Sequence, residues 1–291
     1  MKKSDINQDI PIVTLNHHLR PDAYQALASF YDILELDESG STSHLNRFLK
    51  AQFQNKNVSK IADVCCGTGA QSLELFKHFK IQASDLSPSM INEAQKKLAQ
   101  MKSDYVTATD KFQIIEGQLE FKVANMMDVT LNECQALIAM YNGVGHLSLA
   151  EFKISLQNWY GELKAPGIIV FDFFSLDYFK SLNESEQLDF DQITERGHVK
   201  RWVKSRVKER IEKIADDEES ELEKPAETLK AAYLDCSWRT SINGLISYET
   251  TSVRLYTEKE VATALVECGF GLVGTKKMTE GDVIIVVAQK N

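Results

Sequence analysis

The sequence contains little cysteine, and its few cysteines are not arranged in pairs. There are five in 291 residues, and none forms a Cys-x-x-Cys motif. An odd, unpaired set argues against a disulfide framework and a structural zinc site, and it predicts a chain of the reducing cytoplasm. The adjacent His17 and His18 have no third ligand at a useful spacing, so no metal site is predicted. The cysteines are Cys65, Cys66, Cys134, Cys236 and Cys268.

Long hydrophobic runs and excess positive charge are also missing. The longest apolar runs, such as residues 283–288, are far shorter than the roughly 18 residues of a membrane-spanning helix. The opening MKKSDINQDI has no apolar stretch of the kind found in a secretory signal. With 33 Lys+Arg against 42 Asp+Glu, the net charge is −9. We therefore expect no nucleic-acid partner and no membrane association.

Glycine and proline are sparse, at 14 and 5 residues, and there are no repeats or low-complexity linkers. The length and the 43% hydrophobic content fit one large domain, or one domain with an insertion. Residues 209–227 are strongly acidic, and we interpret them as a solvated connection inside such an insertion.

Apolar strand-like runs alternate with helix-period segments between residues 60 and 174. This alternation predicts a parallel sheet flanked by helices. Near the C-terminus, Thr257 and Glu260 form a capping box. Two strands follow, and the link between them is so short that they must be antiparallel. The strands are predicted at 61–66, 81–85, 119–124, 136–141, 168–174, 270–277 and 282–288; no prediction is made for 99–118.

Residues 175–256 show a mostly β pattern. Asn243-Gly244 lies between two β-rich runs and predicts a tight hairpin. A two-residue turn there pairs Arg239 with Tyr248 and Tyr233 with Arg254. Residues 202–211 fit either a strand or a helix stripe, and we favour the strand.

The first predicted strand ends in Asp63-Val-Cys-Cys-Gly67-Thr-Gly69, which opens a helix. Two glycines two positions apart allow a sharp turn and a close approach of a ligand to the backbone. In a dinucleotide enzyme this turn holds a diphosphate. Here Ser72 replaces the third glycine of that motif, and Asp63 suits a ligand with an ammonium group better. Asp85, 22 positions after Asp63, stands where open α/β sheets place a carboxylate for ribose hydroxyls.

This turn, the run Asp-Leu-Ser-Pro-Ser-Met at 85–90, the run Ala-Asn-Met-Met-Asp at 124–128 and the C-terminal strand pair occur together. In this combination the sequence resembles the class I S-adenosylmethionine-dependent methyltransferases. The resemblance implies an α/β fold with a doubly wound, Rossmann-like, seven-stranded sheet and an antiparallel C-terminal strand pair. It implies a core made of residues 1–174 and 257–291, with an N-terminal lid helix, and a small antiparallel β insertion at 175–256. It also implies methyl transfer from S-adenosylmethionine to a small-molecule amine or hydroxyl, by an enzyme that could form a homodimer.

The same resemblance assigns the cofactor contacts. Asp85 would bind the ribose, and Gly67 and Gly69 would line the methionine moiety, with Asp63 nearby. The remaining contacts would be Thr68 in the glycine turn, Leu86 and Met90 beside the adenine, Asn125 and Met126 at its amino edge, Tyr31 in the lid, and Tyr141 and Asn142 after the fourth strand.

The segment from Tyr141 to His146 follows the fourth strand, where the family places groups near the sulfonium and the acceptor. It lacks the Asn/Asp-Pro-Pro-Tyr/Phe run of base-amine methyltransferases, and the chain lacks the paired-glutamate loop of arginine methyltransferases. Both absences favour a small-molecule acceptor. His146 is either a structural histidine or an acid/base group, and His146 or Tyr141 could help to deprotonate an amine.

We expect the insertion to supply the acceptor pocket. One hairpin face offers aromatic walls and guanidinium groups for a carboxylate or phosphate. The alternative is a solvated sheet face with cross-strand Tyr–Arg pairs. The predicted acceptor contacts are Trp202, Tyr233, Arg239, Tyr248 and Arg254.

Three other functions stay open. An NAD-dependent Rossmann oxidoreductase uses a similar first turn. A non-catalytic S-adenosylmethionine-binding protein would share every motif above. Transfer of an aminopropyl group to a polyamine would require a strongly acidic acceptor pocket.

Overall fold

The computed structural model describes residues 24–25, 27–35, 41–107, 118–182, 184–194, 197–213, 228–278 and 282–290. His17, His18 and most of the acidic stretch at 209–227 lie outside the described residues, as do parts of the predicted lid segment. All five cysteines are described, and all are free thiols.

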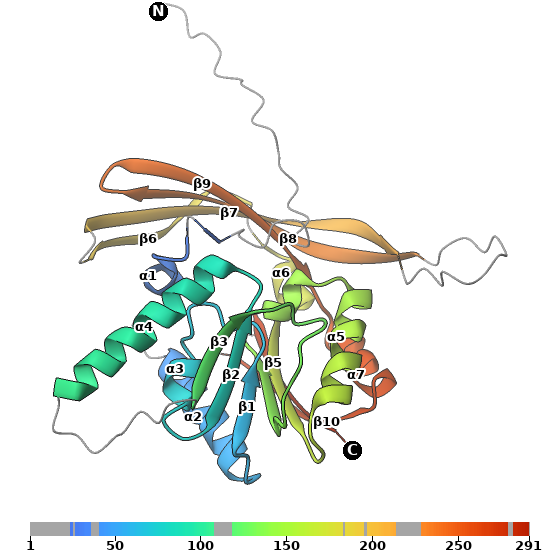
Figure 1. The fold of residues 1–291 in the computed structure, drawn as a ribbon. Helices are drawn as coiled ribbons and strands as arrows, with labels where there is room; N and C mark the ends of the chain where they lie inside the picture. The colour runs from blue at the N-terminus through green and yellow to red at the C-terminus, as the bar shows by residue number, and fades with distance from the viewer. Residues whose placement is uncertain are drawn as a thin grey trace, which may run out of the picture.

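Seven strands form a mixed sheet in the order β10-β11-β5-β4-β1-β2-β3 (Figure 1). Strands β1 to β5 are parallel, and β11 joins antiparallel between β5 and β10. The predicted Rossmann-like sheet with an antiparallel C-terminal pair is therefore confirmed. The strands are β1 (Lys60–Asp63), β2 (Lys80–Asp85), β3 (Leu119–Val123), β4 (Ala136–Ala139), β5 (Ile168–Phe174), β10 (Phe270–Lys277) and β11 (Val283–Lys290).

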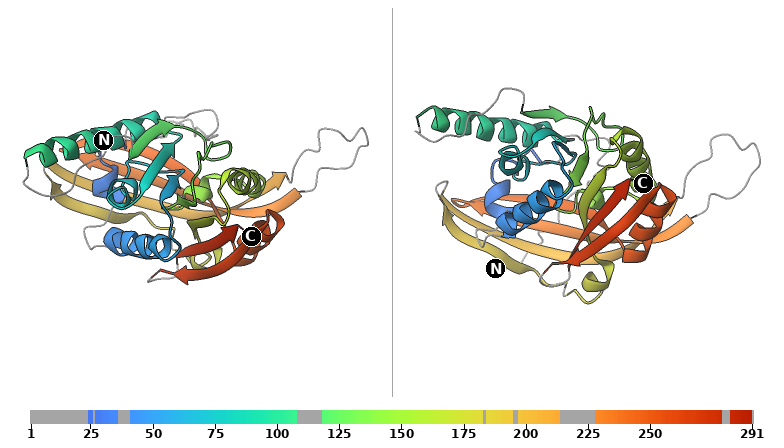
Figure 2. Two further views of the ribbon diagram at one scale, coloured as in Figure 1. Left: turned by 60° about the horizontal axis from the view of Figure 1, so that its bottom comes forward. Right: turned by 90° about the horizontal axis from the view of Figure 1, so that it is seen from below.

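Helices cover both faces of this sheet (Figure 2). On one face, Phe53 and Ile91 are buried among the residues of a first apolar cluster. On the other, Trp159 and Leu265 belong to a second cluster. Among the described helices none is both long enough and apolar enough to cross a lipid bilayer. The helices are α1 (Tyr31–Glu35), α2 (Ser41–Gln54), α3 (Ser72–Leu75), α4 (Pro88–Thr107), α5 (Leu149–Glu162) and α7 (Glu258–Glu267), with a short 3₁₀ helix, η2 (Gly143–His146).

The stretch after β5 forms a second, antiparallel sheet in the order β6-β7-β8-β9. The segment for which we favoured a strand lies in β7. The turn at Asn243-Gly244 has positive φ at both residues, 51° and 87°, as a tight hairpin requires. The hairpin register pairs Arg239 with Tyr248 and Tyr233 with Arg254, as predicted. The elements are α6 (Leu176–Phe179), β6 (Gln187–Thr194), β7 (Gly197–Lys213), β8 (Thr228–Ile242) and β9 (Leu245–Leu255).

The second sheet lies across the end of the first sheet at which the parallel strands finish (Figure 1). Its apolar face buries Leu234, Val253 and Leu255 against Phe174, the last residue of β5, and against α6. A backbone bridge joins Ser175 to Tyr256 at the same place. The fold therefore sets a β wall above the carboxyl ends of the strands, which is where open α/β sheets bind their ligands.

Candidate cofactor and acceptor site

A cavity opens beneath this wall, at the carboxyl ends of the central strands. With its open mouth it encloses about 1050 Å³. It is lined mainly by the turns that follow β1, β2, β3 and β4. The structure thus brings together residues that are far apart in the sequence, from Tyr24 to Leu147. Of the predicted cofactor residues, the cavity is lined by Tyr31, Gly67, Thr68, Asp85, Leu86, Met90, Asn125, Met126 and Tyr141, of which Tyr31 comes from α1.

The glycine turn after β1 leaves its backbone open to the cavity. Gly67 has a φ of 52°, and a Cβ added there would meet no atom within 4 Å. Gly69 has a φ of 84°, but a Cβ there would lie 2.9 Å from Phe121. Gly69 therefore allows the turn to pack closely on Phe121. It was predicted to contact the cofactor, but it does not line the cavity.

Asp85 at the end of β2 is already oriented by backbone donors. Gly67 N–H donates to its Oδ2 at 2.8 Å, and Ser87 N–H donates to its Oδ1 at 2.9 Å. Burial raises the pKa of Asp85, while these N–H groups act in the opposite direction. Each oxygen keeps a further lone pair, so the carboxylate is suited to accept two neighbouring hydroxyl groups, such as those of a ribose.

The apolar side of the cavity is formed after β2 and β3. Met90 on α4 is only 2% exposed. The turn after β3 is fixed from both sides, because Met127 N–H donates to Asn125 Oδ1 at 3.0 Å and the Trp159 indole N–H donates to the Met126 carbonyl at 2.8 Å. These bonds preform the apolar side of the cavity, where the resemblance places the adenine ring.

Gln71 is a cavity residue that the sequence did not reveal. Its side chain is 3% exposed, and its Nε2 has no acceptor among the described residues. It lines the cavity at the start of α3, close to the glycine turn. A buried donor without an acceptor is costly, so this position calls for a ligand with an acceptor, such as the carboxylate at the methionine end of S-adenosylmethionine. The residues present therefore fit this cofactor from ribose to carboxylate.

Helix α1 is attached directly over the glycine turn. Thr68 Oγ1 and Lys97 Nζ both contact the Asp32 carboxylate. Tyr31, the neighbour of Asp32, reaches into the cavity. The arrangement is compatible with the expected lid segment. Thr68 was expected to contact the cofactor, but its hydroxyl donates to Asp32 in that segment.

Comparison with known proteins agrees with this geometry. Residues 61–167 match the family model described as a methyltransferase domain. These residues are a methyltransferase domain. With the sheet and cavity described above, the chain contains a methyltransferase domain and has the fold of the class I S-adenosylmethionine-dependent methyltransferases.

Several solved structures share the fold of this methyltransferase. One is an S-adenosylmethionine-dependent methyltransferase from Clostridium acetobutylicum, with 16% identity and a TM-score of 0.63 over 92% of this chain and 99% of that one. A second is an amino pentose methyltransferase from Micromonospora echinaspora with S-adenosylmethionine bound, with 14% identity and a TM-score of 0.62 over 92% and 97%. A third is a sugar N-methyltransferase from a Streptoalloteichus species, with 16% identity and a TM-score of 0.57 over 99% and 97%. No curated protein matched the chain.

Two further residues predicted to contact the cofactor lie behind the cavity wall of the methyltransferase. Asp63 is 2% exposed and accepts a hydrogen bond from Ser72 Oγ at 2.6 Å. Burial raises the pKa of Asp63 to about 7. Asn142 is buried, and its Oδ1 accepts from Phe174 N–H at 3.0 Å. Neither side chain lines the cavity, because each is used to hold the loop that does.

His146, a predicted catalytic residue, lines the same cavity. Its Nε2 lies 2.9 Å from Tyr24 Oη, and the two rings meet edge to face. Tyr24 in turn packs edge to face on Tyr31. Burial raises the pKa of Tyr24, so its phenol stays protonated near neutral pH.

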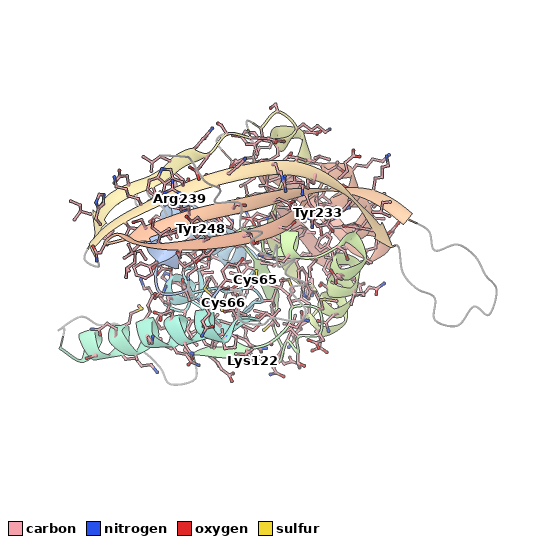
Figure 3. All side chains as sticks on the ribbon, turned by 90° about the horizontal axis from the view of Figure 1, so that it is seen from above. Cys65, Cys66, Lys122, Tyr233, Arg239 and Tyr248 are labelled. Carbon is pink, nitrogen blue, oxygen red and sulfur yellow. The ribbon has the colours of Figure 1, made fainter. Side chains whose placement is uncertain are left out.

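Tyr233, Arg239 and Tyr248 lie on the second sheet (Figure 3), and none of the predicted acceptor contacts lines the cavity. Tyr248 is 71% exposed, and the Arg239 guanidinium stacks on Trp202 with its carbon 3.8 Å from the ring centroid. The role of this face as an acceptor pocket therefore stays a prediction. Side chains alternate across a strand, and the apolar alternate set, which includes Leu234 and Val253, is the one turned toward the core.

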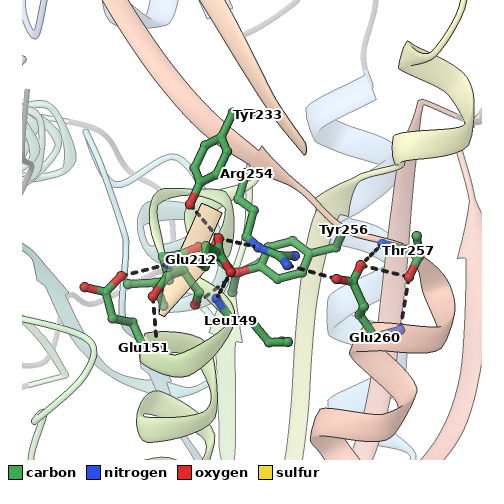
Figure 4. A network of polar contacts seen from close by, with 11 residues as sticks. Leu149, Glu151, Glu212, Tyr233, Arg254, Tyr256, Thr257 and Glu260 are labelled. Carbon is green, nitrogen blue, oxygen red and sulfur yellow. Dashed lines mark hydrogen bonds and ion pairs between the residues drawn. The ribbon is translucent and has the colours of Figure 1, made fainter. Parts of the chain in front are cut away.

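Arg254 and Tyr233 form a structural network instead (Figure 4). Arg254 is 0% exposed. Its Nε donates to Glu212 at 2.8 Å, and its Nη2 donates to Glu260 at 2.9 Å. Tyr233 Oη donates to Glu212 at 2.5 Å. The network ties β7 and β9 to the capping box of α7, so Arg254 cannot receive an acceptor without breaking that junction.

Replacing Gln71 with alanine is expected to weaken S-adenosylmethionine binding about tenfold, because a hydrogen bond to a charged group contributes about 1.5 kcal/mol or more. Isothermal titration calorimetry measures the change. Gln82→Ala is the matched control, since Gln82 is also buried but donates to the Thr130 carbonyl away from the cavity. Equal affinity in the wild type and Gln71→Ala would remove Gln71 from the cofactor site.

Proposed function

We propose that this methyltransferase transfers its methyl group to an amine nitrogen of a small molecule. The observation that carries the proposal is the His146–Tyr24 pair at the acceptor end of the cofactor cavity. The names of structurally similar proteins support a nitrogen acceptor, since they include a sugar N-methyltransferase and a glycopeptide N-methyltransferase.

S-adenosylmethionine supplies a methyl group that is already strongly electrophilic. The protein must therefore hold a neutral nitrogen in line with that methyl group and keep water out. An amine is mostly protonated near neutral pH, so a group that removes its proton is needed. The imidazole of His146 is suited to take this proton, with the Tyr24 hydroxyl fixing the orientation of the ring. Tyr141 forms the neighbouring wall of the cavity.

We further propose that residues 175–256 form the acceptor-side wall, through the inner face of the second sheet. Glu249 lies on that face, paired with Trp238 across the hairpin. Burial raises the pKa of Glu249, with the Arg201 guanidinium opposing the shift. The negative charge of Glu249 also acts on Tyr24 and contributes to raising the pKa of the Tyr24 phenol. A carboxylate placed here favours an acceptor with a positively charged amino group.

An acceptor screen tests the proposal. Purified protein with S-adenosylmethionine is offered amino sugars and simple amines, each beside an analogue with a hydroxyl in place of the amino group, and released S-adenosylhomocysteine is measured. We expect turnover with amines only. With the best acceptor, His146→Ala should lower kcat roughly 100-fold, with S-adenosylmethionine affinity little changed.

The control for that variant is His198→Ala, because His198 is an exposed histidine on β7 that pairs with Asp191. It should retain wild-type kcat. Turnover of the hydroxyl analogues at equal rates would contradict a nitrogen acceptor, and full activity of His146→Ala would exclude the histidine as the base.

A further inference from the structure

The turn after β4 has a strained backbone. Tyr141 and Asn142 both adopt the left-handed conformation, with φ values of 59° and 56°. For residues other than glycine this conformation costs free energy, so it persists only where the surrounding structure enforces it. Two such residues in succession next to the cofactor cavity require an explanation.

The turn is enforced by one buried carboxylate on β5. Asp172 is 5% exposed, and its Oδ1 accepts from Asn142 N–H at 2.5 Å while its Oδ2 accepts from Tyr141 N–H at 3.1 Å. The Asn142 side chain adds a second link between the turn and β5, because its Oδ1 accepts from Phe174 N–H, on the same strand as Asp172. Both strained residues therefore have their N–H groups fixed by Asp172.

The turn positions the segment that leads to His146. Tyr141, Gly143 and His146 all line the cofactor cavity. Gly143 packs so closely on the glycine turn that a Cβ would lie 2.3 Å from Cys65 Sγ. Beyond His146, Tyr256 Oη donates to the Leu147 carbonyl at 2.8 Å. The segment is held at its start by Asp172 and at its end by Tyr256.

We infer that Asp172 is a positioning residue of the methyl-transfer site, which holds the turn at Tyr141 and Asn142 and through it the cavity wall that carries His146. Asp172 acts through this turn and does not line the cofactor cavity. The inference concerns the cofactor end as well as the acceptor end, so it can be tested with S-adenosylmethionine alone and does not depend on the proposed acceptor.

The positioning requires the ionised carboxylate, because both oxygens accept an N–H. Burial raises the pKa of Asp172 to about 7, against the opposing effect of the Asn142 and Tyr141 N–H groups. Protonation would turn one oxygen into a donor that faces an N–H. The hold on the turn therefore strengthens as the pH rises above about 7 and weakens as the pH falls below that value. The other titratable groups around this position are Tyr31, Glu35, Tyr141 and Asp282, which line a neighbouring cavity with Asp172, and the thiol of Cys65.

The test is calorimetry of S-adenosylmethionine binding between about pH 6 and about pH 9. We expect wild-type affinity to fall below pH 7. Asp172→Asn should bind about tenfold more weakly at the alkaline end, since one charged acceptor is lost, and it should lack most of the acid decrease. Asp235→Asn is the control, because Asp235 accepts from Ser252 Oγ at 2.7 Å within the second sheet and does not line the cofactor cavity. That variant should bind S-adenosylmethionine with wild-type affinity at alkaline pH. Its affinity should still fall at acid pH, because Asp172 is intact.

Asn142→Ala provides a second variant if Asp172→Asn does not fold. It loosens the same turn but keeps the carboxylate, so it should bind more weakly while retaining the pH dependence. A purely structural role for Asp172 predicts lower thermal stability with unchanged affinity in the folded protein. Wild-type affinity of Asp172→Asn across the whole pH range would overturn the inference.

Discussion

Replacing Asp85 with alanine is expected to weaken S-adenosylmethionine binding by about two orders of magnitude. The carboxylate is fixed by the Gly67 and Ser87 N–H groups, with both oxygens still able to accept from the ribose hydroxyls. Two hydrogen bonds to a charged acceptor contribute about 1.5 kcal/mol or more each, and each 1.4 kcal/mol is about tenfold in affinity. Titration calorimetry on ligand-free protein measures the loss.

Asp85→Asn is the matched variant for this experiment. It keeps the size and one acceptor oxygen, so its affinity should lie between those of the wild type and Asp85→Ala. Because the carboxylate also holds the glycine turn, thermal unfolding of each variant should be measured to show that the protein remains folded. If Asp85→Ala binds within twofold of the wild type, the ribose assignment is wrong.

Replacing Arg254 with alanine is expected to destabilise the protein by about 3–5 kcal/mol, because it leaves a buried charge without its partner. Glu212 is 8% exposed and receives Arg254 Nε and Tyr233 Oη. The guanidinium also lies over the Tyr256 ring, 4.3 Å from its centroid. Urea denaturation gives the free energy of unfolding and its change.

Two further variants separate the buried charge from the loss of packing. Arg254→Met combined with Glu212→Gln removes both charges and should recover much of the stability that Arg254→Ala loses. Arg239→Ala removes an arginine from the outer face, where it stacks on Trp202, and should cost about 1 kcal/mol or less. Equal stability of Arg254→Ala and Arg239→Ala would contradict the role of the network.

Local patterns in the sequence were sufficient to bring the glycine turn and Asp85 together at one edge of the sheet. The glycine turn and Asp85 are placed by the ends of neighbouring parallel strands, so their spacing along the chain predicts their proximity in space. The hairpin register was also predictable, since a two-residue turn at Asn243-Gly244 leaves no freedom in the pairing.

The acceptor end could not be predicted from the same patterns. Alternation along β8 and β9 defines two faces, but which face turns inward depends on packing against Phe174 and α6. The aromatic and guanidinium groups made the outer face look like a pocket, although Arg254 is instead neutralised by Glu212, 42 positions away. The predicted strand at 136–141 ends early, as β4 at Ala139, because Asp172 draws the next residues into the left-handed turn.

Gln71 and Tyr24 show a second limit of the sequence. Gln71 is an ordinary polar residue at the start of a helix, and only its burial without an acceptor marks it as a ligand contact. Tyr24 is recognisable as a candidate site residue only because its hydroxyl lies 2.9 Å from His146 Nε2. Both observations require the three-dimensional structure, and no spacing of residues along the sequence predicts them.

Calorimetric titration of stripped wild-type protein with S-adenosylmethionine, and in parallel with NADH, tests the central claim most directly. We expect saturable binding of one S-adenosylmethionine per chain, competition by S-adenosylhomocysteine and no heat with NADH. Binding of NADH, or the lack of any uptake of S-adenosylmethionine, would contradict it.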